Sequence, residues 1–169
     1  RFAREMHADI RAYSAGLVGK LNAAILAFID LPQPVVAAVH GLVTGGSIGL
    51  VLAADLVYLA PQVVFKAHYA TAGFAPDGGW TALLGRKAGA HRAAAALLLN
   101  RSLRAADALA WGLANEVVAA DALHAAAAAA AHRIAGYPRG TMLAAKRLLQ
   151  GERAALAAAL EAEREQFLR

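Results

Sequence analysis

The chain has 169 residues, a length that suits one domain with a hydrophobic core of its own. It contains no cysteine, which excludes disulfides, thiolate catalysis and cysteine-based zinc sites. The net charge of +5 fits an ordinary basic surface, nucleic acid or a small polyanion, but the basic residues are scattered and form no block, so nucleic acid is not expected.

Hydrophobic residues make up 59% of the chain, and many of them are alanine, which favours helix. No uncharged run of about 18 strongly apolar residues is present, so no membrane span is predicted. The charged start lacks the pattern of a signal peptide, which favours a cytoplasmic protein. Because the first residue is not Met, we expect the sequence to be part of a longer protein, with an N-terminal portion missing.

Residues 2–28 form the first predicted element, a helix. Apolar side chains recur there at spacings of three and four, and residues 31–34 carry two prolines that end the helix. Residues 35–39 are continuously apolar, which indicates a strand buried on both faces.

A glycine turn follows at residues 41–46. Beyond it the pattern predicts a buried helix, two short strands and a glycine-containing loop, at residues 47–54, 56–59, 63–65 and 70–79.

The rest of the chain, from residue 81, reads as helical almost throughout, with one more short strand at 115–118. The last three predicted helices cover residues 120–135, 139–150 and 152–169, with Pro138 and Gly151 between them. Strands separated by crossovers indicate an α/β fold with parallel pairing. We divide it into a core at 1–118 and a helical region at 119–169.

The glycine turn is the first candidate for chemistry. It leaves backbone N–H groups free at the start of a helix, where they can bind an anion or the developing oxyanion of a thioester. The phosphate-loop patterns GxxxxGK[ST] and GxGxxG are absent. Ser47 resembles a nucleophile elbow only superficially, and no His–Asp pair is evident to serve it.

Carboxylates are scarce in the core region. No Glu occurs between Glu5 and Glu116, and the acids within the core are Asp55 and Asp77. Asp55, between a helix and a strand, suits a structural hydrogen-bonding role. Asp77 lies in an apolar glycine loop, where a raised pKa would suit a proton shuttle, but it could equally be a helix N-cap.

Aromatic side chains flank Asp77. Tyr69 either orients the carboxylate or a substrate carbonyl, or is a core tyrosine, while Phe74 and Trp80 are expected to line a substrate pocket. No metal site is expected, since His124 and His132 lack a third ligand at a suitable spacing.

The segment 34–60, PVVAAVHGLVTGGSIGLVLAADLVYLA, resembles the core signature of the crotonase superfamily, the enoyl-CoA hydratase/isomerase family. The downstream segments that follow the order of the family's pattern are 73–76, 84–86, 100–117 and 144–149.

The resemblance implies a spiral of β-β-α turns with a helical trimerisation region. It implies an acyl-CoA thioester as substrate, coenzyme A being part of that substrate and no other cofactor, and a homotrimer or hexamer. Gly46 would supply one oxyanion N–H, with Gly45 also at the substrate, while the second N–H would come from an upstream segment that this chain does not contain.

Departures from the family pattern bear on the reaction. Hydratases carry glutamates at the positions of Gly49 and Tyr69, so water addition by such a pair is not expected here. Asp77 matches a position used by isomerases, including dienoyl-CoA isomerases, and by the nucleophilic aspartate of 4-chlorobenzoyl-CoA dehalogenase. We therefore expect an isomerase with Asp77 as acid/base. The alternatives are an Asp77-nucleophile dehalogenase or thioester hydrolase, and a non-catalytic or RNA-binding protein.

Overall fold

The computed structural model describes residues 2–169, with side chains described from residue 9 onward. The first helix, α1 (Phe2–Asp30), has the predicted extent, and it ends just before the two prolines. The expected apolar contacts of Phe2 and Met6 lie outside the described side chains.

In the described part of the chain, residues 2–169, six strands form two small sheets. The first contains β1 (Val36–Val39), β3 (Leu56–Leu59) and β6 (Glu116–Val117), and the second contains β2 (Leu42–Thr44), β4 (Val64–Lys66) and β5 (Leu103–Arg104). The pairs β1–β3, β2–β4 and β3–β6 are parallel, as predicted, whereas β4–β5 is antiparallel.

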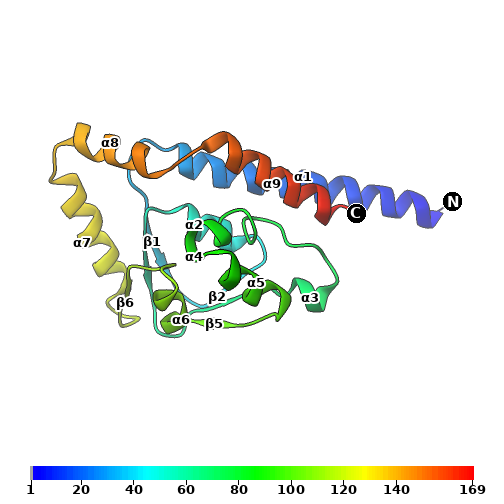
Figure 1. The fold of residues 1–169 in the computed structure, drawn as a ribbon, viewed down its shortest axis with the longest axis horizontal. Coiled ribbons are helices and arrows are strands. Elements are labelled where there is room, and N and C mark those ends of the chain that lie inside the picture. Colours follow the sequence, from blue (N-terminus) through cyan, green and yellow to red (C-terminus); the bar gives the residue numbers. More distant parts are fainter. Residues whose placement is uncertain (1) are drawn as a thin grey trace.

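The chain passes from the first sheet to the second twice, between β1 and β2 and between β3 and β4, and it returns to the first between β2 and β3 and between β5 and β6. Gly41, with a φ of +74°, lies at the first passage, where a left-handed backbone lets the chain turn after only two residues. Each pair of strands is followed by a helical segment, α2 after β2 and the segment from residue 69 after β4, so the backbone winds as a spiral (Figure 1).

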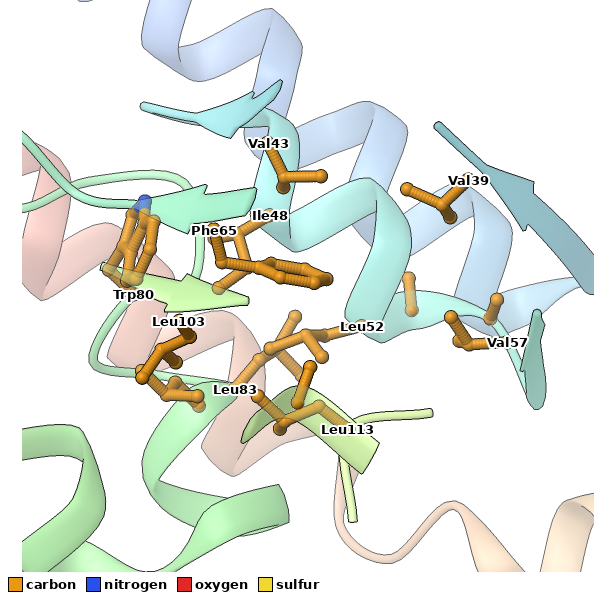
Figure 2. Packing of buried hydrophobic residues seen from close by; sticks show 14 of the residues in the cluster. Val39, Val43, Ile48, Leu52, Val57, Phe65, Trp80, Leu83, Leu103 and Leu113 are labelled. Atoms are coloured by element: carbon orange, nitrogen blue, oxygen red, sulfur yellow. The ribbon is translucent and has the colours of Figure 1, made fainter. Parts of the chain in front are cut away.

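Helix α2 (Ser47–Ala53) lies inside this spiral. Its buried side chains Ile48 and Leu52 point toward Phe65 of β4, with Leu103 and Leu113 on the same side (Figure 2). Burying each such side chain is worth about 1.5–3 kcal/mol, so α2 is the apolar centre around which both sheets pack.

The second half of the chain is mainly helical. Its helices are α3 (Tyr69–Ala72), α4 (Leu84–Ala88), α5 (Ala90–Leu98), α6 (Ala105–Ala110), α7 (Leu123–Ala135), α8 (Arg139–Leu149) and α9 (Arg153–Phe167). Two expectations were wrong in detail. Residues 69–72 form a helical turn at the start of the predicted loop, and the turns at 81–83 and strand β5 interrupt the region that was predicted to be helical almost throughout.

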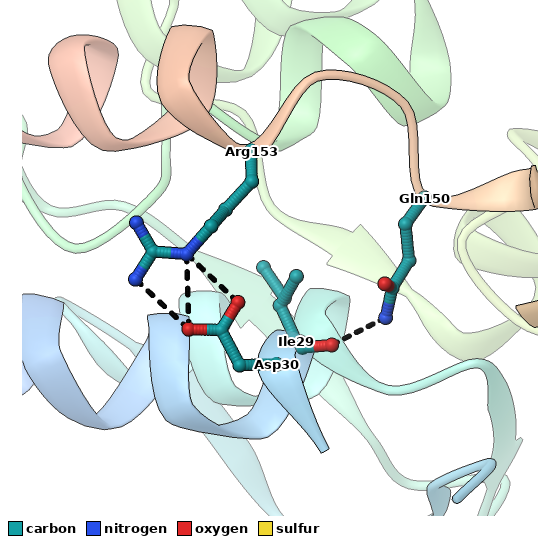
Figure 3. Close-up of polar contacts among 4 residues, drawn as sticks. All are labelled: Ile29, Asp30, Gln150 and Arg153. Carbon is teal, nitrogen blue, oxygen red and sulfur yellow. Dashed lines mark hydrogen bonds and ion pairs between the residues drawn. The ribbon is translucent and has the colours of Figure 1, made fainter. Parts of the chain in front are cut away.

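Helices α1 and α9 lie side by side (Figure 1). Arg153 makes a bidentate ion pair with Asp30 at 2.8 Å, and the Gln150 side chain donates to the carbonyl of Ile29 (Figure 3). Farther along, Asn22 Nδ2 donates to the carbonyl of Leu160 at 3.0 Å. The end of the chain is thus fastened along the second half of the first helix, from Ala15 to Asp30.

Part of α1, Asp9–Asp30, is long and apolar enough to cross a membrane by length and composition, which the sequence reading did not expect. Only 17% of that stretch is buried. One face of it, with Val18, Ile25 and Ile29, nevertheless packs inward, and its last residue forms the ion pair with α9.

Asp55 has the structural role predicted for it. Its Oδ2 accepts the amide of Val35 at 2.7 Å and pairs at 2.9 Å with Lys146 Nζ, whose side chain is almost fully buried. Lys146 also donates to the carbonyl of Gln33 at 2.9 Å. This cluster fastens α8 to the start of β1, away from Asp77.

Candidate functional site

The glycine turn leads from β2 into α2. Gly45 has a φ of +51°, and Gly46 is the N-cap residue of α2. An N-cap N–H has no carbonyl one turn earlier in its own helix, so the helix itself supplies no acceptor for it. The side chain of Leu21 covers Gly46, since a Cβ there would lie 2.1 Å from Leu21 Cδ2.

The hydroxyl of Ser47 closes this turn. Its Oγ donates to the carbonyl of Thr44 at 2.7 Å and accepts the amide of Thr44 at 3.0 Å. With both bonds directed at one backbone unit, Ser47 holds the shape of the turn, in keeping with the lack of a nucleophile pattern around it.

Trp80 supports the same turn from within the core. Its indole Nε1 donates to the carbonyl of Gly45 at 2.7 Å. That carbonyl and the N–H of Gly46 belong to one planar trans peptide and point in opposite directions, so the bond fixes the direction of the Gly46 N–H. The prediction that Trp80 lines the substrate pocket is corrected, because its side chain is 0% exposed.

Asp77 and Tyr69 form a buried pair beside the turn. The Tyr69 hydroxyl donates to Asp77 Oδ1 and also lies 3.3 Å from the Asp77 carbonyl oxygen. The two residues are 7% and 8% exposed. Of the two roles considered for Tyr69, the structure shows a core tyrosine that also orients the carboxylate.

Burial sets the protonation behaviour of this pair. It raises the pKa of Asp77 above its usual value of 3.8, and the nearby carboxylate of Glu163 raises it further, while the bond from Tyr69 opposes the shift. The pKa of Tyr69 is also raised, first by burial and then by its bond to Asp77. Tyr69 therefore stays a donor at neutral pH.

The N-cap interpretation of Asp77 was wrong. Helix α4 begins only at Leu84, and its N-cap is Leu83. The segment directly after Asp77 is a series of turns, so its carboxylate is available for another role.

Glycines bring the Asp77 loop into direct contact with α2. A Cβ on Gly78 would lie 2.4 Å from Gly46 Cα, and a Cβ on Gly49 would lie 2.3 Å from the carbonyl oxygen of Gly78. The two backbones meet where neither has room for a side chain. Asp77 is thereby held next to the Gly46 turn.

Glu163 of α9 reaches the same loop, and the sequence reading missed it. Its Oε2 accepts the amide of Gly79 at 2.7 Å, and its Oε1 accepts the amides of Thr81 and Ala82 at 2.6 and 2.8 Å and the Thr81 hydroxyl at 2.5 Å. One signal was available in the sequence: Glu163 continues the buried stripe of Leu156 and Leu160 at helical spacing.

Phe74 lies at the open side of the loop. Its ring is 58% exposed and packs against Phe167 of α9, with ring centroids 5.4 Å apart. The exposed face leaves the predicted substrate contact of Phe74 possible in geometry, and it remains a prediction.

A cavity of about 420 Å³ lies elsewhere, at the far end of α2. Leu52, Asp55, Arg86, Lys87 and Arg153 are among its lining residues, and none of the predicted site residues is. Among the described side chains, from residue 9 onward, no three of His, Asp or Glu gather in an arrangement that could hold a metal ion.

Comparisons with known proteins agree with this architecture. The family model described as enoyl-CoA hydratase/isomerase matches residues 3–169. A relative from Mycobacterium avium (strain 104), named Probable enoyl-CoA hydratase echA17, is 42% identical over 123 residues, which cover 73% of this chain and 48% of the relative.

Solved structures give the same result. An enoyl-CoA hydratase from Mycobacterium avium subsp. paratuberculosis K-10 aligns with a TM-score of 0.73 and 32% identity over 92% of this chain and 60% of that one. An enoyl-CoA hydratase from Bacillus halodurans aligns with a TM-score of 0.79 and 26% identity, over 89% and 61%.

The spiral α/β core with its helical C-terminal region is a crotonase fold. The chain belongs to the enoyl-CoA hydratase/isomerase family of the crotonase superfamily. It spans about half the length of the curated relatives that it matches.

Proposed function

We propose that the protein is an acyl-CoA isomerase that shifts a carbon–carbon double bond by proton transfer through Asp77. The observation that carries this proposal is the buried Asp77–Tyr69 pair packed against the Gly46 turn. It combines an acid/base and an oxyanion donor at one place, and the family relationship supports an acyl-CoA thioester as substrate.

In this mechanism the thioester carbonyl accepts a hydrogen bond from the N–H of Gly46. The bond strengthens as negative charge moves onto the oxygen, which stabilises an enolate more than the starting thioester. Trp80 keeps that N–H directed by holding the other side of the peptide.

Asp77 then moves the proton. As a carboxylate it takes a proton from the γ-carbon of an α,β-unsaturated thioester, or from the α-carbon of a β,γ-unsaturated one. The electrons of the broken C–H bond delocalise to the thioester oxygen as a dienolate. The protonated Asp77 returns the proton to the other carbon, so no net proton or electron is consumed. A raised pKa suits a group that must hold the proton between these steps.

The structure also gives a physical reason against hydration. A glutamate at position 49 would have to place its Cβ 2.3 Å from both the Gly78 carbonyl and Ile25 Cδ1. The other hydratase position carries Tyr69, whose hydroxyl is engaged with Asp77. Two carboxylates facing a water molecule are therefore not available at these positions.

Assembly and compartment also belong to the proposal. Leucines on the helical half are largely exposed, including Leu98, Leu99, Leu148 and Leu149, which suits burial between subunits of a homotrimer or hexamer. We propose this assembly, and a location in the cytoplasm, as expectations that the resemblance to the family carries.

Asp77→Asn tests the assignment on the protein that carries this chain, screened with unsaturated and aromatic acyl-CoAs by absorbance. We expect kcat to fall about 10²-fold or more, because the amide cannot accept the proton. Asp121→Asn, on an exposed position, is the matched control and should keep full activity. Full activity of Asp77→Asn on every substrate would refute the assignment.

A second measurement separates acid/base from nucleophilic use of Asp77. Single-turnover reactions in H₂¹⁸O incorporate label into the aspartate only if it forms a covalent ester that water then hydrolyses. We expect no label in Asp77, and labelling would establish the dehalogenase or hydrolase alternative instead.

A further inference from the structure

Among the side chains that the structure describes, Glu163 is the one buried carboxylate near the site that the proposed mechanism does not use. It lies on α9, far along the chain from Asp77, and is 4% exposed. Burying a carboxylate costs several kcal/mol unless it is well hydrogen-bonded, so its position there calls for an explanation.

The hydrogen bonds of Glu163 all come from the segment directly after Asp77. Oε2 holds the amide of Gly79, and Oε1 holds the amides of Thr81 and Ala82 together with the Thr81 hydroxyl, at distances from 2.5 to 2.8 Å. Bonds to a charged acceptor are about twice as strong as those between neutral groups. Four of them fix the backbone that carries Asp77 and Trp80.

The segment that Glu163 holds, residues 79–82, adjoins both parts of the proposed chemistry. Asp77 precedes it, and Trp80 within it holds the Gly45 carbonyl at 2.7 Å. Gly79 contacts α2 as well, since a Cβ there would lie 3.1 Å from Gly49 Cα. A shift of this segment would therefore move the acid/base and the oxyanion donor at once.

We propose that Glu163 is a positioning residue that ties α9 to the Asp77 loop and sets the geometry and charge environment in which Asp77 transfers its proton. The inference rests on the proposed function. Glu163 itself touches neither the substrate nor the reacting atoms in this arrangement; it acts through the 79–82 backbone and through its field.

The electrostatic part follows from the same position. The titratable groups that face Asp77 are Tyr69 from α3, whose bond lowers the pKa of Asp77, and Glu163 from α9, whose negative charge raises it. Removing the charge of Glu163 should therefore lower the pKa of Asp77, and removing its hydrogen bonds to residues 79–82 should lower kcat.

Glu163→Gln is the discriminating variant. Its remaining oxygen can keep the bonds to Thr81 and Ala82, while its NH₂ faces the N–H of Gly79, donor against donor. We expect kcat to fall about tenfold with KM changed less than about threefold, and the acid limb of the kcat profile to move to lower pH. The matched control is Glu165→Gln, an exposed position on the same helix, which should change neither.

A titration that needs no substrate separates this inference from the proposed function. The ¹³C carboxyl signal of Asp77, assigned with Asp77→Asn, should titrate at lower pH in Glu163→Gln than in wild type. An unchanged titration would overturn the inference even if the protein turns over acyl-CoA. A wild type without turnover refutes the proposed function while this titration still reports on Glu163.

A milder variant guards against a folding defect in Glu163→Gln. If Glu163→Gln does not fold, Thr81→Ala removes one of the four bonds at an exposed position. We then expect kcat to fall about threefold with KM unchanged. A variant that lowers thermal stability but leaves kcat and the Asp77 titration as in wild type would show that Glu163 only anchors the helix.

Discussion

Replacing Gly49 by alanine tests the contact between α2 and the Asp77 loop. The new Cβ would lie 2.3 Å from the Gly78 carbonyl oxygen and 2.3 Å from Ile25 Cδ1. Carbon–oxygen contacts settle near about 3.3 Å, so one partner must retreat by roughly 1 Å. The Ile25 methyl can rotate away, whereas the carbonyl is backbone and must carry its loop with it.

The magnitude follows from this geometry. Overpacking a core costs about 1–3 kcal/mol, and the gain from replacing a helical glycine by alanine, about 0.5–1 kcal/mol, offsets part of it. We expect a net loss of about 1 kcal/mol in the free energy of unfolding, which lowers Tm by about 2–4 °C in a chain of this size. A loop moved by 1 Å next to Asp77 can cost about 10²-fold in kcat.

Thermal unfolding and acyl-CoA isomerisation measure the two effects separately. Gly16→Ala is the control, since a Cβ there has nothing within 4 Å in α1, and it should raise stability by about 0.5–1 kcal/mol. Gly49→Glu should gain no hydration of enoyl-CoA. Unchanged Tm and kcat in Gly49→Ala, or hydratase activity in Gly49→Glu, would refute the claim that Gly78 closes this position.

Four further changes have defined outcomes. Tyr69→Phe removes the bond that lowers the pKa of Asp77, so the acid limb of the pH–rate profile should move to higher pH. Burial raises the pKa of Asp77 in the folded protein above its value in the unfolded chain. Protonated Asp77 therefore stabilises the fold below the unfolded pKa, and this stabilisation is lost as the pH rises through the folded pKa. In urea unfolding between about pH 4 and 8, Asp77→Asn should make the free energy of unfolding fall less with rising pH. Trp80→Phe loses the bond to Gly45, and kcat should fall roughly tenfold with a smaller change in KM, as removal of a group that orients an oxyanion donor does. Lys146→Met leaves the partially exposed carboxylate of Asp55 without its ion-pair partner. The free energy of unfolding, measured by chemical denaturation, should fall by about 2–4 kcal/mol, with kcat per folded molecule unchanged.

The helices and strands that form continuous apolar runs were predicted correctly from the sequence. The strands at 35–39 and 56–59 and the helix at 47–54 agree with β1, β3 and α2 within a residue or two, because each is an apolar run bounded by Gly, Pro or Asp. Strands β2 and β5 were not predicted. They are three and two residues long, and pairing with β4 rather than any pattern of their own makes them strands.

The site was predicted as far as its parts lie close in sequence. Asp77, Tyr69 and the Gly46 turn were identified, and the structure brings them together. Glu163 was not, because its role depends on how α9 docks more than eighty residues beyond the loop that it holds. Trp80 was misassigned for a related reason, since an indole facing a pocket and one facing a buried carbonyl have the same local sequence.

The attachment of α9 to α1 has a consequence for the order of folding. Its contacts join residues 123 to 149 positions apart, such as Arg153 with Asp30 and Arg164 with the carbonyl of Ala15. Closing so large a loop is entropically costly, and such contacts form slowly compared with local ones. On the ribosome, the spiral around α2 can pack first, whereas residues 79–82 can form their hydrogen bonds to Glu163 only after α9 has been synthesised. We therefore expect hydrogen exchange during refolding to protect the amides of Gly79, Thr81 and Ala82 late, so that activity returns only after the core is already compact.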